Sequence, residues 1–207
     1  YTHVVTDMAA EWIGQQPAGQ PFCLILGHKA PHTPFTPEPS YEKIFDDVKI
    51  AYPDSAFHLE GKPDWVRQRL DTWHGIYGPL YGYRKEFPDR SKQAEADFAR
   101  FVRCYTATIK SVDDSVGRIY AALEKAGVLD DTIIVFAGDN GSFLGEHGMT
   151  DKRTMHEESI RVPMLVRYPR QFKPATVVNQ MVLNVDLAPS LLDLCGAKPL
   201  QNIHGQS

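Results

Sequence analysis

Residues 132–141 read TIIVFAGDNG, a β-branched apolar run that ends in an Asp-Asn pair between two glycines. Such a run is typical of a strand that is buried on both faces, as in a parallel sheet covered by helices. In open α/β sheets, ligands bind beyond the carboxyl ends of the strands. The Asp-Asn pair therefore lies where a functional site is expected.

Asp139 and Asn140 offer a carboxylate oxygen and an amide oxygen side by side. Hard oxygen donors of this kind suit Ca²⁺ or Mg²⁺, and Gly138 and Gly141 let the backbone turn tightly around an ion. The same Asp-Asn-Gly sequence is also ordinary turn chemistry that needs no metal. From these residues alone, both interpretations stay open.

Apolar patterns on both sides of this run alternate between helix and strand. Strands are expected at 22–26, 132–136 and 162–168, with a short strand or an extended loop at 177–185. Helices are expected from the chain start to about residues 14–17, over 64–76, over 93–126 with Gly127 as the cap, and over 186–195 with Asp186 as the N-cap. The segment 93–126 forms one long helix or two joined end to end. This order predicts an α/β fold with a partial doubly wound, mostly parallel sheet flanked by helices.

The composition is that of a globular domain, with 43% hydrophobic and 23% charged residues among 207. A formal net charge of −4, without a Lys/Arg run, argues against a nucleic-acid partner. No apolar stretch approaches the ~20 residues that a membrane span needs. Three widely spaced cysteines exclude a disulfide framework or a zinc site. We expect Cys23 and Cys104 to be buried as small hydrophobic residues.

The residues after the Asp-Asn pair continue as SFLGEHGMTDKRTMHEESIRVP, residues 142–163. This order of Asp-Asn, Gly-Glu-His-Gly, Asp-Lys-Arg and Glu-x-Ser-x-Arg-Val-Pro resembles the sulfatase family of the alkaline-phosphatase superfamily over about 30 residues. A second segment, LGHKAPHTPF at 26–35, is similar to the family's strand followed by Pro-His-x-Pro. The family's histidine contacts the sulfate ester and corresponds to His32. Taken alone, His32 reads as a loop histidine held by prolines.

The resemblance extends over essentially the whole chain. Residues 105–118 resemble the family's long helix before the metal-binding strand, and residues 204–207 resemble the loop that follows the sheet. Residues 65–75 are similar to members that act on sulfated sugars, including glucosamine-6-sulfatases. An aromatic-rich helix of this kind also fits simple packing.

The resemblance implies chemical roles for four residues. Asp139 and Asn140 are expected to hold one divalent ion, Ca²⁺ or Mg²⁺, as a Lewis acid on a sulfate oxygen. Lys152 is expected to place its ammonium against another sulfate oxygen. His32 is expected to donate a hydrogen bond to the ester or to protonate the leaving alcohol.

His147 and Arg153 are the predicted substrate-binding residues. His147 could instead orient the loop that carries Lys152. Lys152 could pair with Asp151 or Glu157 at the surface, and Arg153 could make a similar surface pair.

The nucleophile that the family uses is a formylglycine, made from the Cys or Ser of a Cys/Ser-x-Pro-x-Arg motif. No cysteine or serine of this chain stands in that motif, and the family's paired aspartates and Gly-Lys-x-His segment are also absent. All three lie upstream in relatives. We therefore expect residues 1–207, which begin at Tyr1 without Met, to be one segment, the C-terminal part of a sulfatase catalytic domain without its nucleophile region. Alone, this segment is expected to be inactive.

The resulting hypothesis is a sulfuric ester hydrolase that acts on a small-molecule or glycan sulfate, most similar to carbohydrate sulfatases of the glucosamine-6-sulfatase kind. A phosphonate or phosphate monoester hydrolase of the same superfamily has the same layout, and the upstream nucleophile would distinguish the two. A non-catalytic truncated domain is the third reading. The resemblance implies a periplasmic, secreted or lysosomal location and makes no prediction about oligomeric state.

Overall fold

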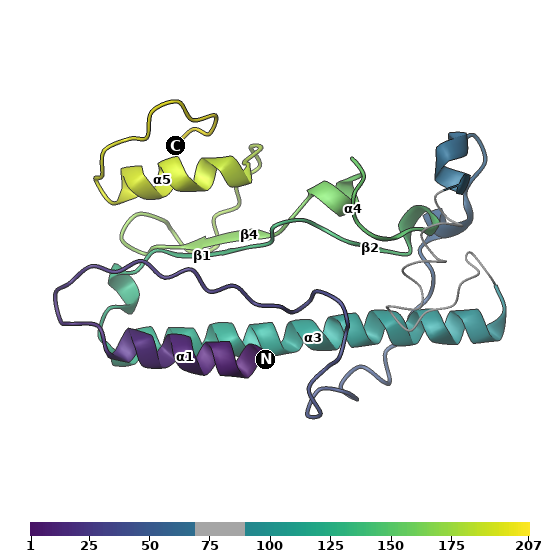
Figure 1. The fold of residues 1–207 in the computed structure, drawn as a ribbon, viewed down its shortest axis with the longest axis horizontal. Coiled ribbons are helices and arrows are strands. Elements are labelled where there is room, and N and C mark those ends of the chain that lie inside the picture. Colours follow the sequence, from purple (N-terminus) through teal and green to yellow (C-terminus); the bar gives the residue numbers. More distant parts are fainter. Residues whose placement is uncertain (69–89) are drawn as a thin grey trace.

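The computed structural model describes residues 1–68 and 90–207. Its elements form three layers (Figure 1). Helices α1 (Thr2–Gly14) and α3 (Lys92–Lys125) lie on one side, strands β1 (Ile134–Ala137) and β4 (Met164–Arg167) lie in the middle, and helix α5 (Leu187–Leu194) lies on the other side. Helices on both sides of a strand layer are typical of an α/β fold, as the sequence predicts.

Helix α3 is one continuous helix of 34 residues, which decides between the two predicted alternatives. The Ser91 side chain caps it by accepting a hydrogen bond from the Ala94 amide at 3.2 Å. At its end, Gly127 takes a φ of +73°, the left-handed conformation that terminates many helices. No helix in the described part of the chain has both the length and the apolar character needed to cross a membrane.

Helices α1 and α3 meet through small buried hydroxyl side chains. The Thr6 hydroxyl donates to Ser115 Oγ at 2.7 Å, and the Ser111 hydroxyl donates to Thr2 Oγ1 at 3.4 Å. Buried hydroxyl groups need such partners, because an unmade hydrogen bond in the interior is costly. Ser115 Oγ also lies 3.0 Å from Nε2 of His28, which ties the segment after α1 to α3.

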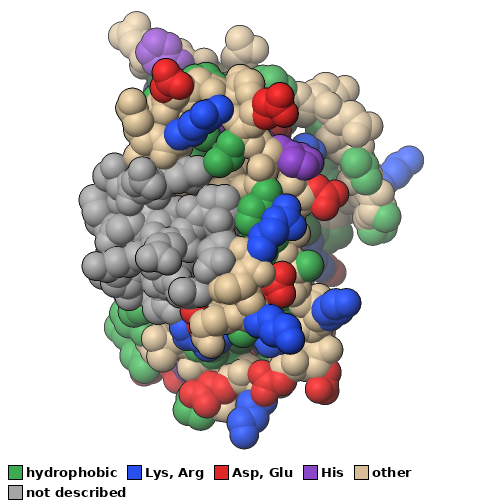
Figure 2. Space-filling view, turned by 90° about the vertical axis from the view of Figure 1, so that its right-hand side faces the viewer, with side chains coloured by type: hydrophobic (Ala, Val, Ile, Leu, Met, Phe, Trp, Pro, Cys, Tyr) green, Lys and Arg blue, Asp and Glu red, His purple; other side chains and the backbone are tan. Residues whose placement is uncertain are grey.

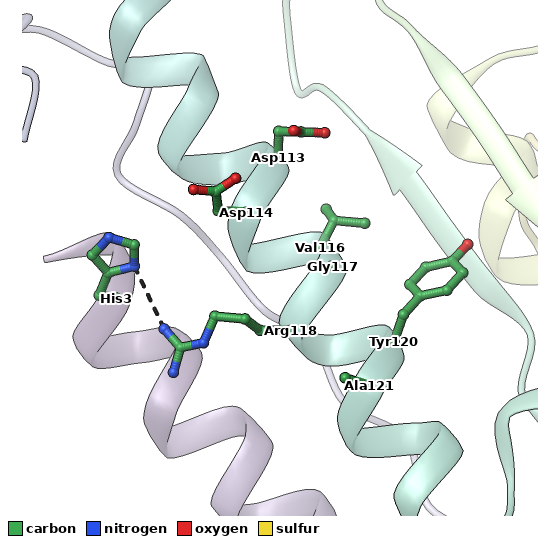
Figure 3. Close-up of a pocket in the computed structure, with 8 residues that line it drawn as sticks. All are labelled: His3, Asp113, Asp114, Val116, Gly117, Arg118, Tyr120 and Ala121. Carbon is green, nitrogen blue, oxygen red and sulfur yellow. Dashed lines mark hydrogen bonds between the residues drawn. The ribbon is translucent and has the colours of Figure 1, made fainter. Parts of the chain in front are cut away.

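A groove of about 710 Å³ lies along the same helix pair (Figure 3). Arg118 extends from α3 toward α1, where it pairs with Asp7 and approaches His3 Nδ1 at 3.5 Å. Pairs as exposed as these contribute little each to stability. The groove contains none of the predicted site residues; its lining is His3, Asp113, Asp114, Val116, Gly117, Arg118, Tyr120 and Ala121.

An aromatic cluster anchors the loops that follow residue 32. Phe98 and Phe101 on α3 are each 2% exposed. Tyr52 stacks on Phe98 with ring centroids 4.3 Å apart, and Phe35 meets Phe101 edge-on at 5.5 Å. Burying a side chain of this size stabilises the fold by about 1.5–3 kcal/mol. The cluster therefore fixes the loop only three positions after His32.

The strands form two antiparallel pairs. Strand β1 pairs with β4, with Ile134 opposite Arg167, and β2 (Phe143–Leu144) pairs with β3 (Thr150–Asp151). The predicted mostly parallel, doubly wound sheet is therefore not seen in the described residues. A parallel connection needs a long crossover, usually a helix, whereas the segment between β1 and β4 contains a small ribbon, the turn η3 (Glu146–Gly148) and the four-residue helix α4 (Glu157–Ile160).

The strand predicted at residues 22–26 is wrong for this structure. The segment is irregular and pairs with no strand among the described residues, and Ile25 is 91% exposed. An apolar run becomes a strand only where a neighbouring strand accepts its backbone hydrogen bonds. Cys23, predicted to be buried, is also exposed, and Cys104 is half-buried. Residues 177–185 carry no strand and follow the extended-loop alternative until the turn η4 (Asn184–Asp186).

The remaining predicted helices are confirmed where they are described. Residues 64–68 are helical, and the rest of the helix predicted over 64–76 lies outside the described residues. Helix α5 begins after Asp186, as predicted. The Asp186 carboxylate accepts hydrogen bonds from the backbone amides of Gln206 and Leu183, each at 2.9 Å, rather than from the helix. Those two hydrogen bonds hold the pKa of Asp186 below its ordinary value.

His28 gives the fold a predictable response to acid. Burial lowers the pKa of His28 from its ordinary 6.5, and its buried Nδ1 has no hydrogen-bond partner within residues 1–68 and 90–207. The unfolded chain therefore takes up a proton before the folded chain does, so we expect the free energy of unfolding to fall as the pH drops below about 6.5.

The substitution His28→Gln should flatten this decline between about pH 7 and pH 5, measured by urea unfolding. His58 is exposed, so His58→Gln should leave the slope as it is. An unchanged slope in His28→Gln would show that another group controls the acid response.

Candidate functional site

The Asp139–Asn140 pair lies directly beyond the carboxyl end of β1, as predicted. The Asn140 amide donates to Asp139 Oδ1 at 2.9 Å, and Asn140 Nδ2 donates to the Gly141 carbonyl at 2.7 Å. These local hydrogen bonds are those of a turn, as the alternative interpretation predicts. The side chains of Asp139 and Asn140 are both exposed. The turn leaves Asp139 Oδ2 and Asn140 Oδ1 without a hydrogen-bond donor among the described residues.

Gly141 packs against the segment of α4 without space for a side chain. A Cβ there would lie 2.1 Å from the Glu158 carbonyl oxygen and 2.8 Å from the Arg161 carbonyl oxygen. The Gly141 amide donates to the Ser159 carbonyl at 2.9 Å. This close approach requires glycine and fixes the loop that carries Asp139 and Asn140 against α4.

Ser159 also holds the loop that carries Lys152. Its hydroxyl, on a residue 5% exposed, accepts hydrogen bonds from the backbone amides of Arg153 at 3.0 Å and Thr154 at 3.5 Å. The Ser142 hydroxyl adds a hydrogen bond to the Asp151 carbonyl at 3.3 Å. One buried serine therefore fastens the Asp139–Asn140 loop and the Lys152–Arg153 loop to the same short helix.

Asp151 lies between the two cations of the second loop. Its Oδ2 accepts from Arg153 Nε at 3.0 Å, and its Oδ1 lies 3.9 Å from Lys152 Nζ. The alternative in which Lys152 pairs with Asp151 is therefore present, although Asp151 is buried and not at the surface. The Lys152 side chain is 25% exposed.

Backbone strain is concentrated in this part of the chain. His147, Asp151 and Arg153 take φ values of 55°, 71° and 88°, the left-handed region that residues with a side chain rarely adopt. Each such residue costs about 1–3 kcal/mol and is kept where the surrounding contacts impose it, often at functional sites.

His147 lies beside this loop in a cluster of rings. Its Nε2 is 3.5 Å from Glu158 Oε1, and its ring centroid is 4.8 Å from that of His156 and 6.2 Å from that of Phe143. Burial, and then the neighbouring His147, lower the pKa of His156. His147 thus contacts Glu158, the neighbour of Ser159. This contact fits the interpretation that His147 orients the loop that carries Lys152.

His32 is exposed on a loop that contains cis peptide bonds before Pro31 and Pro34. Its Nδ1 lies 3.0 Å from the Thr33 carbonyl and 3.5 Å from Lys29 Nζ. No hydrogen bond, ion pair or ring contact among the described residues links His32 to the other predicted site residues. The structure brings Asp139, Asn140, Lys152 and Arg153 onto adjoining loops and does not link His32 to them, and the chemical roles of all these residues stay predictions.

Sequence reasoning missed the roles of Ser159 and His156 and noted Asp151 only as a surface partner. All three lie inside the motif at 142–163. A serine or an aspartate in that motif gives no signal of burial, and the ring contacts of His156 depend on the fold. One weak signal was present in the sequence. The polar residues of the segment 142–163 do not follow the spacing of an exposed helix face, which hints that some of them have other roles.

The metal interpretation fits these residues in part. Asp139 Oδ2 and Asn140 Oδ1 are exposed hard oxygen atoms that suit Ca²⁺ or Mg²⁺. Within residues 1–68 and 90–207, no group of three or more His, Cys, Asp or Glu side chains is arranged to hold a metal. Asp139 and Asn140 therefore fit as two ligands of a divalent ion whose other ligands come from elsewhere.

The surface around the site carries charges of both signs. A hollow of about 520 Å³, lined by Glu157, Glu158, Arg161, Val162 and Pro163, adjoins the loop at Gly138, where an added Cβ would lie 3.5 Å from Val162. Figure 2, a view from the end of the molecule that carries the turn η1 (Asp54–Phe57), shows basic and acidic side chains interspersed over the described surface. On the described part of that face, positive and negative side chains lie close to one another.

Known proteins match the chain along its length. A family model described as Sulfatase matches residues 1–197. The N-acetylglucosamine-6-O-sulfatase of Bacteroides thetaiotaomicron is 31% identical over 249 aligned residues, which cover 100% of this chain and 45% of that protein. The chain thus spans less than half the length of this curated relative.

Solved structures share the fold. The structure of BT4656 in complex with its substrate D-glucosamine-2-N,6-O-disulfate matches with a TM-score of 0.86 and 30% identity, over 100% of this chain and 50% of that one. The phosphonate monoester hydrolase SpPMH from Silicibacter pomeroyi matches with a TM-score of 0.75 and 26% identity, over 100% of this chain and 40% of that one.

The packing of Gly141 makes a prediction with a matched control. Gly141→Ala forces a Cβ into a backbone carbonyl, so we expect the free energy of unfolding to fall by about 1–3 kcal/mol. Gly117, inside α3, has nothing within 4 Å of its added Cβ. Gly117→Ala is therefore expected to raise stability by about 1 kcal/mol through helix propensity. Denaturant unfolding measures both; equal effects from the two substitutions would contradict the close approach at Gly141.

Proposed function

The chain belongs to the sulfatase family, and from this premise we propose that the protein containing it is a sulfuric ester hydrolase. One observation carries the proposal: Ser159 fastens the Asp139–Asn140 loop and the Lys152–Arg153 loop to the same helix. Two cation-binding oxygen atoms and a lysine ammonium thereby lie on adjoining loops. A tetrahedral anion needs such a combination of charges around it.

The proposed substrate is a sulfated carbohydrate that contains glucosamine. The support is that a relative named as an N-acetylglucosamine-6-O-sulfatase aligns with the whole chain, and that the neighbour solved with a glucosamine disulfate has the same fold. The partner of the protein is accordingly a glycan or a small-molecule sulfate ester.

Four residues of this chain have separate proposed roles in the hydrolysis of the ester. Sulfate-ester hydrolysis resembles phosphoryl transfer, in which catalysis mostly positions the group and neutralises charge on its equatorial oxygen atoms. Lys152 offers a compact ammonium to one of these oxygen atoms. His32 donates a hydrogen bond to the ester oxygen, or protonates the leaving alcohol as a general acid. His147 and Arg153 help to bind and orient the substrate.

Two groups outside this structure complete the site. Asp139 and Asn140 would hold a Ca²⁺ or Mg²⁺ ion, which supplies Lewis-acid polarisation of a sulfate oxygen. A formylglycine from another part of the protein would supply the nucleophile.

We place residues 1–207 in the C-terminal part of the catalytic domain. In the complete domain, further strands would extend β1 and β4 into the doubly wound, mostly parallel sheet. A periplasmic, secreted or lysosomal location fits the family.

A phosphonate or phosphate monoester hydrolase is the second candidate. Its support is the likeness to the phosphonate monoester hydrolase structure, which covers the whole chain at 26% identity. The higher identity and TM-score of the glucosamine disulfate complex favour the sulfatase.

The complete protein is expected to release inorganic sulfate from glucosamine 6-sulfate. Lys152→Ala should lower kcat/KM by about 100-fold, because a group that stabilises charge in the transition state is lost. Lys43 is an exposed lysine that belongs to neither loop of the site, and Lys43→Ala should leave the rate unchanged. Faster cleavage of a phosphonate monoester than of the sulfate ester would favour the second candidate.

Residues 1–207 alone should show no turnover of an aryl sulfate and only weak Ca²⁺ binding, because Asp139 and Asn140 offer one formal charge and few ligands. Titration calorimetry should detect no micromolar site. Any residual binding should disappear in Asp139→Ala and persist in Asp46→Ala, which changes an exposed carboxylate elsewhere. Micromolar affinity would contradict the proposed ligand set, and turnover that Lys152→Ala abolishes would contradict the placement of the nucleophile outside residues 1–207.

A further inference from the structure

Asp151 is the only buried carboxylate in the part of the chain that the structure describes. Its side chain is 8% exposed. Burying a carboxylate is unfavourable unless cations or hydrogen-bond donors compensate its charge. The chemistry proposed above gives this residue no role.

We propose that Asp151 is a positioning residue that orients the Lys152 ammonium toward the sulfate ester. The inference rests on the proposed function, in which Lys152 neutralises a sulfate oxygen. It adds a residue that acts on the reaction only through this lysine.

The contacts of the Asp151 carboxylate with Arg153 and with Lys152 differ in kind. Oδ2 accepts a hydrogen bond from Arg153 Nε at 3.0 Å, whereas Oδ1 lies 3.9 Å from Lys152 Nζ. The second separation is too long for a hydrogen bond but close enough for strong attraction between charges. Arg153 therefore fixes the carboxylate, and the carboxylate attracts the ammonium without consuming the three N–H donors that an anion needs.

The backbone holds Asp151 in place from two sides. Its carbonyl accepts from the Ser142 hydroxyl at 3.3 Å, and the residue stands opposite Phe143 in the β2–β3 ribbon. Its φ of 71° favours Asp or Asn over most other residues. A lysine side chain on a flexible stem gains orientation from such a fixed partner.

The left-handed backbone makes Asp151→Asn a suitable test, because asparagine keeps the size and the backbone preference, removes the negative charge and replaces one acceptor oxygen with an amide group. In the complete protein we expect kcat to fall about tenfold or more, while KM changes less than about threefold, since orientation matters most in the transition state. Glu157 is an exposed carboxylate on α4, and Glu157→Gln should leave both constants unchanged. Unchanged kcat in Asp151→Asn overturns the proposal.

A double-mutant cycle separates positioning from general support of the fold. If Asp151 acts through Lys152, then Asp151→Asn should cost less than about twofold in a protein that already carries Lys152→Gln. An equal loss in both backgrounds would mean that Asp151 only stabilises the structure, and would overturn the proposal.

Side-chain mobility gives a readout that needs no activity. NMR relaxation of ¹³C-labelled lysine should show a restrained Lys152 ε-methylene in the unsubstituted protein and in Glu157→Gln, and a mobile one in Asp151→Asn. Equal mobility in all three proteins would overturn the proposal.

The same measurements distinguish failure of this inference from failure of the proposed function. A protein that cleaves phosphonate esters and not sulfate esters refutes the sulfatase proposal, and the cycle then tests Asp151 with the phosphonate substrate. A protein that releases sulfate equally fast with Asp151→Asn supports the sulfatase proposal and refutes the role of Asp151. If the protein has neither activity, the proposed role of Asp151 is tested by comparing the mobility of the Lys152 side chain in the unsubstituted protein and in Asp151→Asn.

Discussion

The hydrogen bonds that Ser159 accepts hold the candidate site together. Its carbonyl takes the Gly141 amide and its hydroxyl takes the Arg153 amide, so a single residue joins loops that follow two different strands. Because Ser159 is buried, water cannot replace either bond, and a lost partner leaves a polar group unsatisfied at a cost of about 1–3 kcal/mol. Neither loop has regular structure of its own to fix it. The relative positions of the Asp-Asn pair and Lys152 therefore depend on this serine.

The helices and the strands of this chain differ in how well they are packed. Helix α3 carries the aromatic cluster around Phe98 and the buried hydroxyl contacts to α1, so it supplies much of the packed interior. The strand layer, by contrast, leaves large apolar side chains in solvent: on β4, Leu165 is 61% exposed and Val166 is 44% exposed. Large exposed apolar patches commonly mark surfaces that another protein surface or a ligand covers. This pattern agrees with a chain that spans less than half the length of its curated relative.

The sequence predicts those parts of the fold whose signal is local. The apolar period of α3, the cap at Gly127 and the apolar runs of β1 and β4 depend on near neighbours, and the structure confirms them. The strand at 22–26 fails because a strand also needs a partner, and the direction of β1 against β4 fails because it is set by the connection between them. The structure places the predicted site residues Asp139, Asn140, Lys152 and Arg153 on adjoining loops, and it does not link His32 to them. Ser159 holds these loops together through contacts that no local sequence pattern reveals.

The strain in the lysine loop follows from the same constraint. A residue such as Asp151 adopts a positive φ only when other contacts hold it there, and here the β2–β3 pairing and the Ser142 hydrogen bond do so. The conformation turns the carboxylate into the interior, where the charge needs both Arg153 and Lys152. The positive φ of Asp151 and the ion pairs of its buried carboxylate are therefore parts of one arrangement, held by the β2–β3 ribbon and the Ser142 hydrogen bond.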